Sequence, residues 1–132
     1  MSTPATTLVT GTDFVTVFVD DWPAAVDFYG TKLGLECSAE YGQIDGAEYE
    51  TGSLTLQLLR AEAIGREFKP SGHPIGLHVD DVAAARAELE SRGVEFAADT
   101  LDSGVCHMAF FEDPAGNALM LHHRYAPKPG RE

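Results

Sequence analysis

The sequence lacks any long hydrophobic run. No stretch of its 132 residues approaches the roughly 18 consecutive apolar residues that a membrane-spanning helix needs. Hydrophobic residues nevertheless make up 44% of the chain and charged residues 23%, which are the proportions of a globular protein. The sequence therefore predicts one soluble domain with a hydrophobic core, and no insertion into a membrane.

Positive charge is also scarce. Nine Lys and Arg residues stand against 21 Asp and Glu residues, so the formal net charge is −12. Such a chain repels nucleic acid and anionic lipid at long range, and we expect neither as a partner. The acidity serves solubility, and it also favours the approach of a cationic ligand.

Several signatures of other protein classes are missing. The two cysteines, Cys37 and Cys106, follow no metal-binding or redox spacing, and we expect them to be reduced thiols. There is no glycine-rich phosphate loop or other cofactor fingerprint, so no cofactor is expected. The N-terminal segment "MSTPATTLVTG" lacks the basic start and apolar block of a secretory signal, which predicts a cytoplasmic location.

One pattern occurs twice along the chain, at an offset of 60 residues. Residues 14–35 begin with alternating apolar positions, pass through Asp-Asp and continue with helical periodicity, and residues 74–96 do the same. In both copies the aspartates stand where a strand ends and a helix begins, so helix capping explains them without a functional role. Gly34 and Gly93 fit the left-handed residue that ends each helix.

Three strand-like segments follow each predicted helix. They are "LECSAEY", "AEYETG" and "LTLQLLR" in the first half, and "VEFAAD", "CHMAFFE" and "ALMLHHR" in the second. The sequence therefore predicts an α+β fold of two tandem βαβββ modules within a single domain that spans residues 1–132. The first module covers about residues 12–60, a Gly- and Pro-containing linker about 61–73, and the second module about 74–125.

A duplicated unit that carries "VDDWPAAVDFYGTKLGL", "HVDDVAAARAELESRGVEF" and "DPAGN" resembles the vicinal oxygen chelate superfamily. That superfamily contains glyoxalase I, extradiol dioxygenases and bleomycin-resistance proteins, and the resemblance covers residues 14–123. It implies that the sheets curl into an open cup with the helices outside, and that a second subunit often completes the cup. In the superfamily's enzymes, side chains from the first and last strands of the modules hold a divalent metal inside this cup.

The positions that the resemblance assigns to metal ligands carry unsuitable side chains here. Carried over by position, they are Phe14 and residue 74 on the first strands, and Thr55 and Met120 on the last strands. Residue 74 is a proline, and a hard divalent ion needs imidazoles and carboxylates rather than these side chains. We therefore expect no metal at the family's usual site.

A displaced metal site is the alternative. Side chains two residues apart on a strand share a face, so His78 and His122 should line the cup beside residues 74 and 120, as should Gln57 beside Thr55. If a metal binds, His78 and His122 are its expected ligands. The sequence does not settle which face His107 occupies.

Two functions remain open at this stage. The first is metal-free binding of a small molecule in the cup, which implies antibiotic resistance by sequestration of an aromatic or cationic natural product of the bleomycin or enediyne kind. The second is a metal-dependent lyase, isomerase or dioxygenase with displaced ligands. We favour sequestration by a homodimer without a catalytic residue, and we expect ligand contacts from Phe14, Thr16, Phe18, Tyr49, Thr55, Gln57, His78, His107, Met120 and His122.

Overall fold

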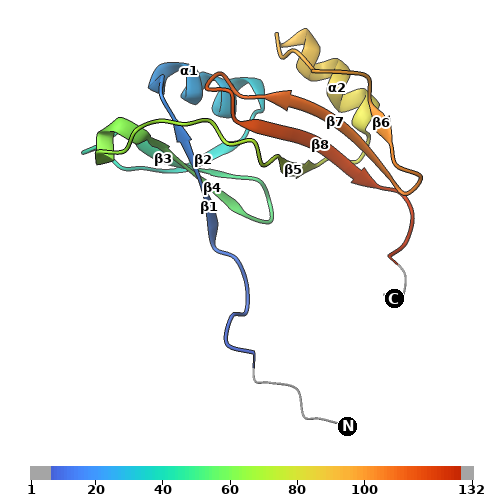
Figure 1. Cartoon of the computed structure of the whole chain (residues 1–132), viewed down its shortest axis with the longest axis horizontal. Helices are drawn as coiled ribbons and strands as arrows, with labels where there is room; N and C mark the ends of the chain where they lie inside the picture. Colours follow the sequence, from blue (N-terminus) through green and yellow to red (C-terminus); the bar gives the residue numbers. More distant parts are fainter. Residues whose placement is uncertain (1–6, 129–132) are drawn as a thin grey trace.

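A computed structural model describes residues 7–128 and contains two four-stranded sheets that lie side by side (Figure 1). The first has the order β1-β4-β3-β2 and the second the order β5-β8-β7-β6. The strands are β1 Phe14–Val19, β2 Glu36–Glu40, β3 Gly46–Glu50, β4 Thr55–Arg60, β5 Ile75–His78, β6 Leu101–Asp102, β7 Cys106–Glu112 and β8 Ala118–Arg124. In each sheet the first strand runs parallel to the last, and the other pairs are antiparallel. This topology confirms the predicted α+β fold.

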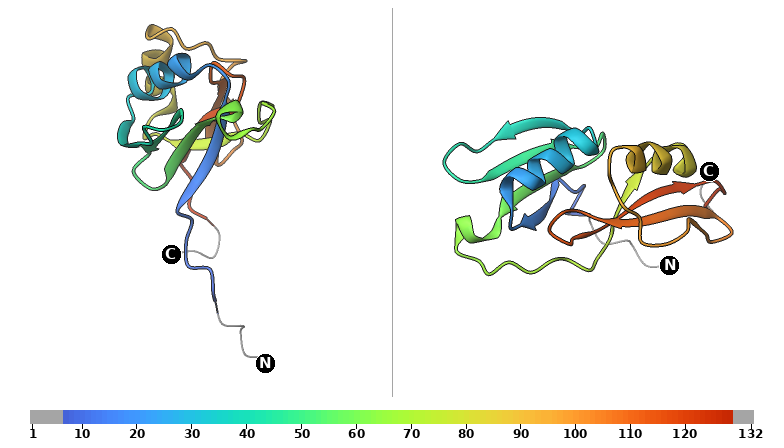
Figure 2. Two further views of the ribbon diagram at one scale, coloured as in Figure 1. Left: turned by 90° about the vertical axis from the view of Figure 1, so that its left-hand side faces the viewer. Right: turned by 90° about the horizontal axis from the view of Figure 1, so that it is seen from above.

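Two helical segments cover the same side of both sheets (Figure 2). The first consists of α1 Trp22–Val26 and the π-helical η1 Asp27–Lys32, and the second is α2 Val82–Ser91. Each begins where the sequence predicts. The side chain of Asp21 accepts a hydrogen bond from the Ala24 amide at 3.1 Å, and Asp81 accepts one from the Ala84 amide at 3.0 Å.

Both sheets bury one face under these helices. Along β1, Val17 and Val19 are buried while the alternating residues Thr16 and Phe18 are only half-buried, and along β4 Leu56 and Leu58 are buried. This period of two is what a strand with one covered face requires. The opposite faces of the two sheets carry no helix, and together they are called the open face below (Figure 1).

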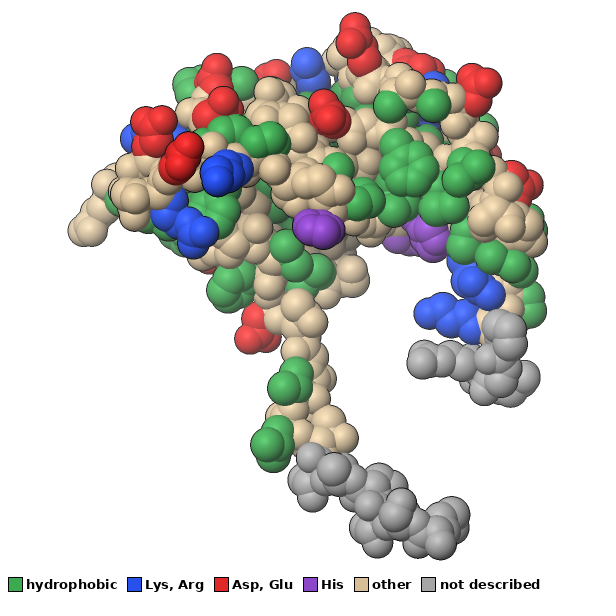
Figure 3. Space-filling view, viewed as in Figure 1, with side chains coloured by type: hydrophobic (Ala, Val, Ile, Leu, Met, Phe, Trp, Pro, Cys, Tyr) green, Lys and Arg blue, Asp and Glu red, His purple; other side chains and the backbone are tan. Residues whose placement is uncertain are grey.

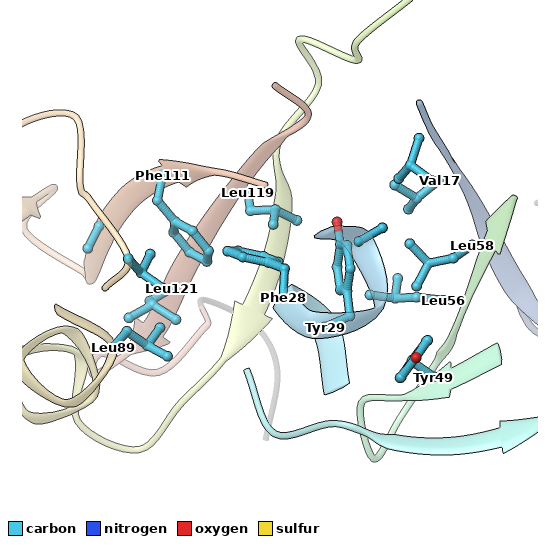
Figure 4. Close-up of a cluster of buried hydrophobic side chains, with 14 of the residues drawn as sticks. Val17, Phe28, Tyr29, Tyr49, Leu56, Leu58, Leu89, Phe111, Leu119 and Leu121 are labelled. Atoms are coloured by element: carbon cyan, nitrogen blue, oxygen red, sulfur yellow. The ribbon is translucent and has the colours of Figure 1, made fainter. Parts of the chain in front are cut away.

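The core continues from one sheet to the other through the first helical segment (Figure 4). The wide turn of η1 turns two consecutive aromatic side chains inward, and Phe28 and Tyr29 are 4% and 0% exposed. The ring of Phe28 lies 6.2 Å from that of Phe111 on β7. The hydroxyl of Tyr29 donates a hydrogen bond to Asp113, which follows β7.

The turn between β7 and β8, residues 113–117, fixes how the sheets meet. Asn117 is 3% exposed and donates from its side-chain amide to the Phe18 carbonyl at 2.8 Å. Its side-chain oxygen accepts from the Ser71 amide at 2.8 Å. Gly116 has a φ of 90°, a value that favours glycine. The sequence "DPAGN" is therefore a junction between β1, the segment before β5, and the second sheet.

Two predicted segments differ from the structure. The strand predicted at residues 94–99 is absent as a strand: only Phe96 forms an isolated bridge, to Phe111, and the edge strand β6 comes later and has two residues. The predicted linker begins with the short 3-10 helix η2 Ala61–Ile64. Among residues 7–128 no helix has the length and apolar character needed to cross a bilayer. The cytoplasmic location is predicted from the N-terminal segment "MSTPATTLVTG". Its first six residues, 1–6, lie outside the residues that the structure describes.

Candidate open-face ligand site

The first sheet brings five predicted ligand-binding residues to the open face. Phe14 and Thr16 of β1 lie directly opposite Thr55 and Gln57 of β4, so the four side chains form two cross-strand pairs. Phe18 follows on the same face of β1. Phe14 is 52% exposed although it is a large apolar side chain. The first sheet thus offers an aromatic and hydroxylic surface that no helix covers, and at its Phe18 end the Arg66 guanidinium lies 4.8 Å from the ring centre.

A chain of hydrogen bonds crosses this surface. The Thr16 hydroxyl donates to the side-chain oxygen of Gln57 at 2.6 Å, and the Gln57 amide donates to the Tyr41 hydroxyl at 2.9 Å. The Tyr41 hydroxyl in turn donates to Oε2 of Glu48 at 2.6 Å. Partial burial and this hydrogen bond to Glu48 raise the pKa of Tyr41, so the phenol stays protonated and remains a donor.

A second carboxylate lies beside the first on β3. Glu50 is opposite Thr55 and accepts hydrogen bonds from the hydroxyls of Ser38 and Thr55. These two hydrogen bonds hold the pKa of Glu50 below its ordinary value. Glu48 and Glu50 form what is called the acidic wall below: two ionised carboxylates within one strand, each held in place by hydroxyl donors.

Sequence analysis missed the acidic wall and Tyr41. The signal was present in "GAEYE", because the two glutamates alternate with Ala47 and Tyr49, which are 1% and 3% exposed. A period of two places the glutamates on the face opposite to these buried residues. The family resemblance directed attention to the first and last strands of each module instead.

The second sheet contributes a different set of side chains to the open face. Met120 and His122 of β8 lie opposite Phe110 and Met108 of β7, and Arg124 follows on the same face. His78 is the cross-strand neighbour of His122, but its side chain is 70% exposed, its ring lies 5.9 Å from that of His123, and its Nε2 lies 3.2 Å from Oδ1 of Asp80. This part of the open face is apolar with imidazole and guanidinium groups, and it complements the acidic wall in charge.

Two predicted ligand contacts do not belong to the open face. Tyr49 is paired with the buried Leu56 and its ring lies 6.4 Å from that of Tyr29, so it is a core residue. His107 is paired with His123 on the face opposite to His122, where its Nε2 lies 3.4 Å from Oδ2 of Asp102. Both corrections follow from strand register, because a shift of one residue moves a side chain to the other face.

The positions implied by the family as metal ligands do not suit a hard divalent ion. Phe14 and Thr55 face each other in the first sheet. In the second sheet the residue opposite Met120 is Gly76 rather than residue 74, because β5 begins only at Ile75. Within residues 7–128 no group of three or more His, Cys, Asp or Glu side chains is arranged to hold a metal. Neither the four family positions nor the displaced histidines therefore supply a complete ligand set.

Each of the two tandem sheets thus has a helical segment on one side and an open face on the other. The model of the Glyoxalase/Bleomycin resistance protein/Dioxygenase superfamily matches residues 11–121, and this chain belongs to that superfamily. A comparison with curated protein sequences gives no significant match.

Solved structures with the same fold include proteins of different activity. A glyoxalase/bleomycin resistance protein/dioxygenase from Nocardioides is 22% identical, covers 96% of this chain and 92% of its own, and has a TM-score of 0.75. TnmS3, an antibiotic binding protein from Streptomyces sp. CB03234, is 24% identical over 90% and 99% of the two chains, with a TM-score of 0.75. Lactoylglutathione lyase from Agrobacterium tumefaciens is 18% identical over 88% and 95%, with a TM-score of 0.71. At these identities the likeness concerns the fold and not the activity.

Proposed function

We propose that this protein binds and sequesters a cationic aromatic small molecule, as an antibiotic-binding protein does, and does not convert it chemically. The observation that carries the proposal is the first sheet's open face, where the acidic wall lies on the same face as the exposed Phe14. Glu48 and Glu50 attract a cation, and Phe14 offers a ring on which a flat ligand stacks.

The ligand is held between two copies of the chain in this proposal. The open face of one copy is incomplete, since Phe14 is 52% exposed. The first sheet carries the acidic wall, whereas the second carries the guanidinium group of Arg124. Charge complementarity therefore favours an assembly in which the first sheet of one copy faces the second sheet of another, with the ligand enclosed between them.

The competing proposal is a metal-dependent lyase, isomerase or dioxygenase. The observation in its favour is that His78 and His122 are cross-strand neighbours. Against it, the side chain of His78 is largely exposed, and within residues 7–128 no third His, Cys, Asp or Glu side chain joins the two histidines in an arrangement that could hold a metal.

Titration with metal-free bleomycin tests the proposal. Calorimetry should give saturable binding with one molecule for each completed site, and mass spectrometry should recover the compound unchanged. In cells that express the protein, survival against bleomycin should level off when the drug exceeds the binding sites, because sequestration acts by mass action.

Two results would contradict sequestration. Protection that continues far beyond the stoichiometric amount of drug indicates turnover, and a chemically altered compound identifies an enzyme. If bleomycin does not bind, the same titration is carried out with other cationic aromatic antibiotics. Binding of one of them supports the proposal, and binding of none contradicts it.

A further inference from the structure

A second recess lies beside the free edge of β1. It is a crevice of about 300 Å³ between β1, the start of β8 and the segment 69–75. Its floor is formed by Val15, Val17, Ile75 and Leu119 together with the buried Asn117, and its rim is polar, with Thr16, Lys69, Ser71 and His73. The crevice lies within one chain, so it does not depend on the assembly proposed above.

The segment that borders this crevice carries positive charge without acidic partners. Within residues 7–128, neither Arg66 nor Lys69 has a carboxylate oxygen within 4.0 Å of its nitrogen atoms, although Asp and Glu outnumber Lys and Arg by 21 to nine. Other basic residues such as Arg86 and Arg92 have such partners. Figure 3 shows several basic side chains on one side of the molecule, with acidic side chains next to them.

Arg66 extends this positive surface to the crevice wall. Its guanidinium carbon lies 4.8 Å from the centre of the Phe18 ring, and Phe18 is one of the lining residues. A cation–π contact of this kind leaves the edge of the guanidinium group available for hydrogen bonds to an anion. Glu67 is the one acidic residue between Arg66 and Lys69, and it is exposed and forms no ion pair with either.

We propose that the crevice binds a small organic acid, with the apolar body of the acid on the floor and its carboxylate at the rim beside Lys69 and His73. Inorganic ions should bind the crevice weakly, since they make no contact with its apolar floor. A neutral compound of the same shape should bind with lower affinity than the acid, because it forms no charge-assisted hydrogen bond with the positively charged side chains at the rim.

Benzoate is a suitable probe, and benzamide is its neutral isostere. We expect saturable chemical-shift changes at the amides of Thr16, Ser71 and His73 when benzoate is added at constant ionic strength. Benzamide should bind at least about threefold more weakly, as expected for loss of one exposed charged contact. Lys69→Gln should reduce benzoate affinity about three- to fivefold and leave benzamide affinity unchanged.

Lys128→Gln is the matched control, because it makes the same charge change on an exposed residue outside the crevice. It should leave benzoate affinity unchanged. Equal binding of benzoate and benzamide, equal effects of the two lysine variants, or shifts that do not saturate would overturn the proposal. Glu48→Gln tests the acidic wall and should leave benzoate affinity intact, so failure of sequestration and failure of the crevice are distinguishable.

Discussion

The hydroxyl of Tyr29 donates a 2.8 Å hydrogen bond to the carboxylate of Asp113, which lies 84 positions further along the chain and is 4% exposed. Asp113 also accepts from the backbone amides of Ala115 and Asn117 and from the Asn117 side chain. Burial and the nearby Asp113 charge raise the pKa of Tyr29, so the tyrosine remains a donor at all physiological pH values.

Tyr29→Phe should therefore lower the free energy of unfolding by about 1–2 kcal/mol, because it removes one donor from a buried carboxylate that keeps its other donors. Urea denaturation of the variant measures the difference. Tyr125→Phe is the control, since Tyr125 donates to the exposed Asp102 and its loss should change stability little. If Tyr29→Phe changes the free energy of unfolding as little as Tyr125→Phe does, the Tyr29 hydroxyl contributes little and the residue stabilises the fold through its ring.

The acidic wall should determine affinity for a cationic ligand. Glu48→Gln and Glu50→Gln should each weaken binding of bleomycin about three- to fivefold at moderate ionic strength, which is the range of one exposed charged contact. Glu90→Gln on α2 makes the same charge change on the covered side and should have no effect. If Glu90→Gln weakens binding equally, net charge rather than the wall attracts the ligand.

Glu50 should keep its charge at lower pH than an ordinary glutamate. Hydrogen bonds from Ser38 and Thr55 lower its pKa, so its ionised form persists as the pH falls below the usual value of about 4.3. A carboxylate whose folded pKa is lowered stabilises the fold at neutral pH, and this contribution is lost as the pH falls through that folded pKa.

Carbon NMR of the side-chain carboxyl group measures this titration. Ser38→Ala should move the midpoint of Glu50 upwards, because one of its two hydroxyl donors is removed. Ser103→Ala, which alters a hydroxyl in the second sheet, should leave the midpoint unchanged. A midpoint of Glu50 at or above the ordinary value would show that these hydrogen bonds do not favour the ionised form.

Metal content distinguishes the two proposed functions. Protein purified without chelator should contain far less than one equivalent of divalent metal for each chain, measured by elemental mass spectrometry. His122→Ala should not change that content, and His123→Ala on the opposite face is the matched control. One equivalent of metal that is lost only in His122→Ala would favour the enzyme.

Local signals in the sequence predicted much of this fold. Asp21 and Asp81 cap helices as expected, and "DPAGN" forms the final turn, because capping and turn formation depend on neighbouring residues. The alternation of apolar residues also indicates that Phe14 and Phe18 share one face of β1 and that Thr55 and Gln57 share one face of β4, whereas the register between these strands comes from the structure.

Long-range register was harder to predict. His107 lies on the covered side because the β7–β8 turn pairs Glu112 with Ala118, and the length of that turn sets the face of every residue on β7. The path after α2 depends on how Phe96 packs against Phe111 and Arg86, which no local pattern in residues 94–99 reveals.

The turn at residues 113–117 makes the two repeats of this chain depend on each other. The corresponding turn of the first sheet, "TGSL", has no aspartate, so only the second copy supplies the carboxylate that Tyr29 of the first copy requires. Asn117 likewise reaches back to β1. The two repeats have diverged into unequal partners, and neither can be cut away without leaving a buried polar group of the other unsatisfied.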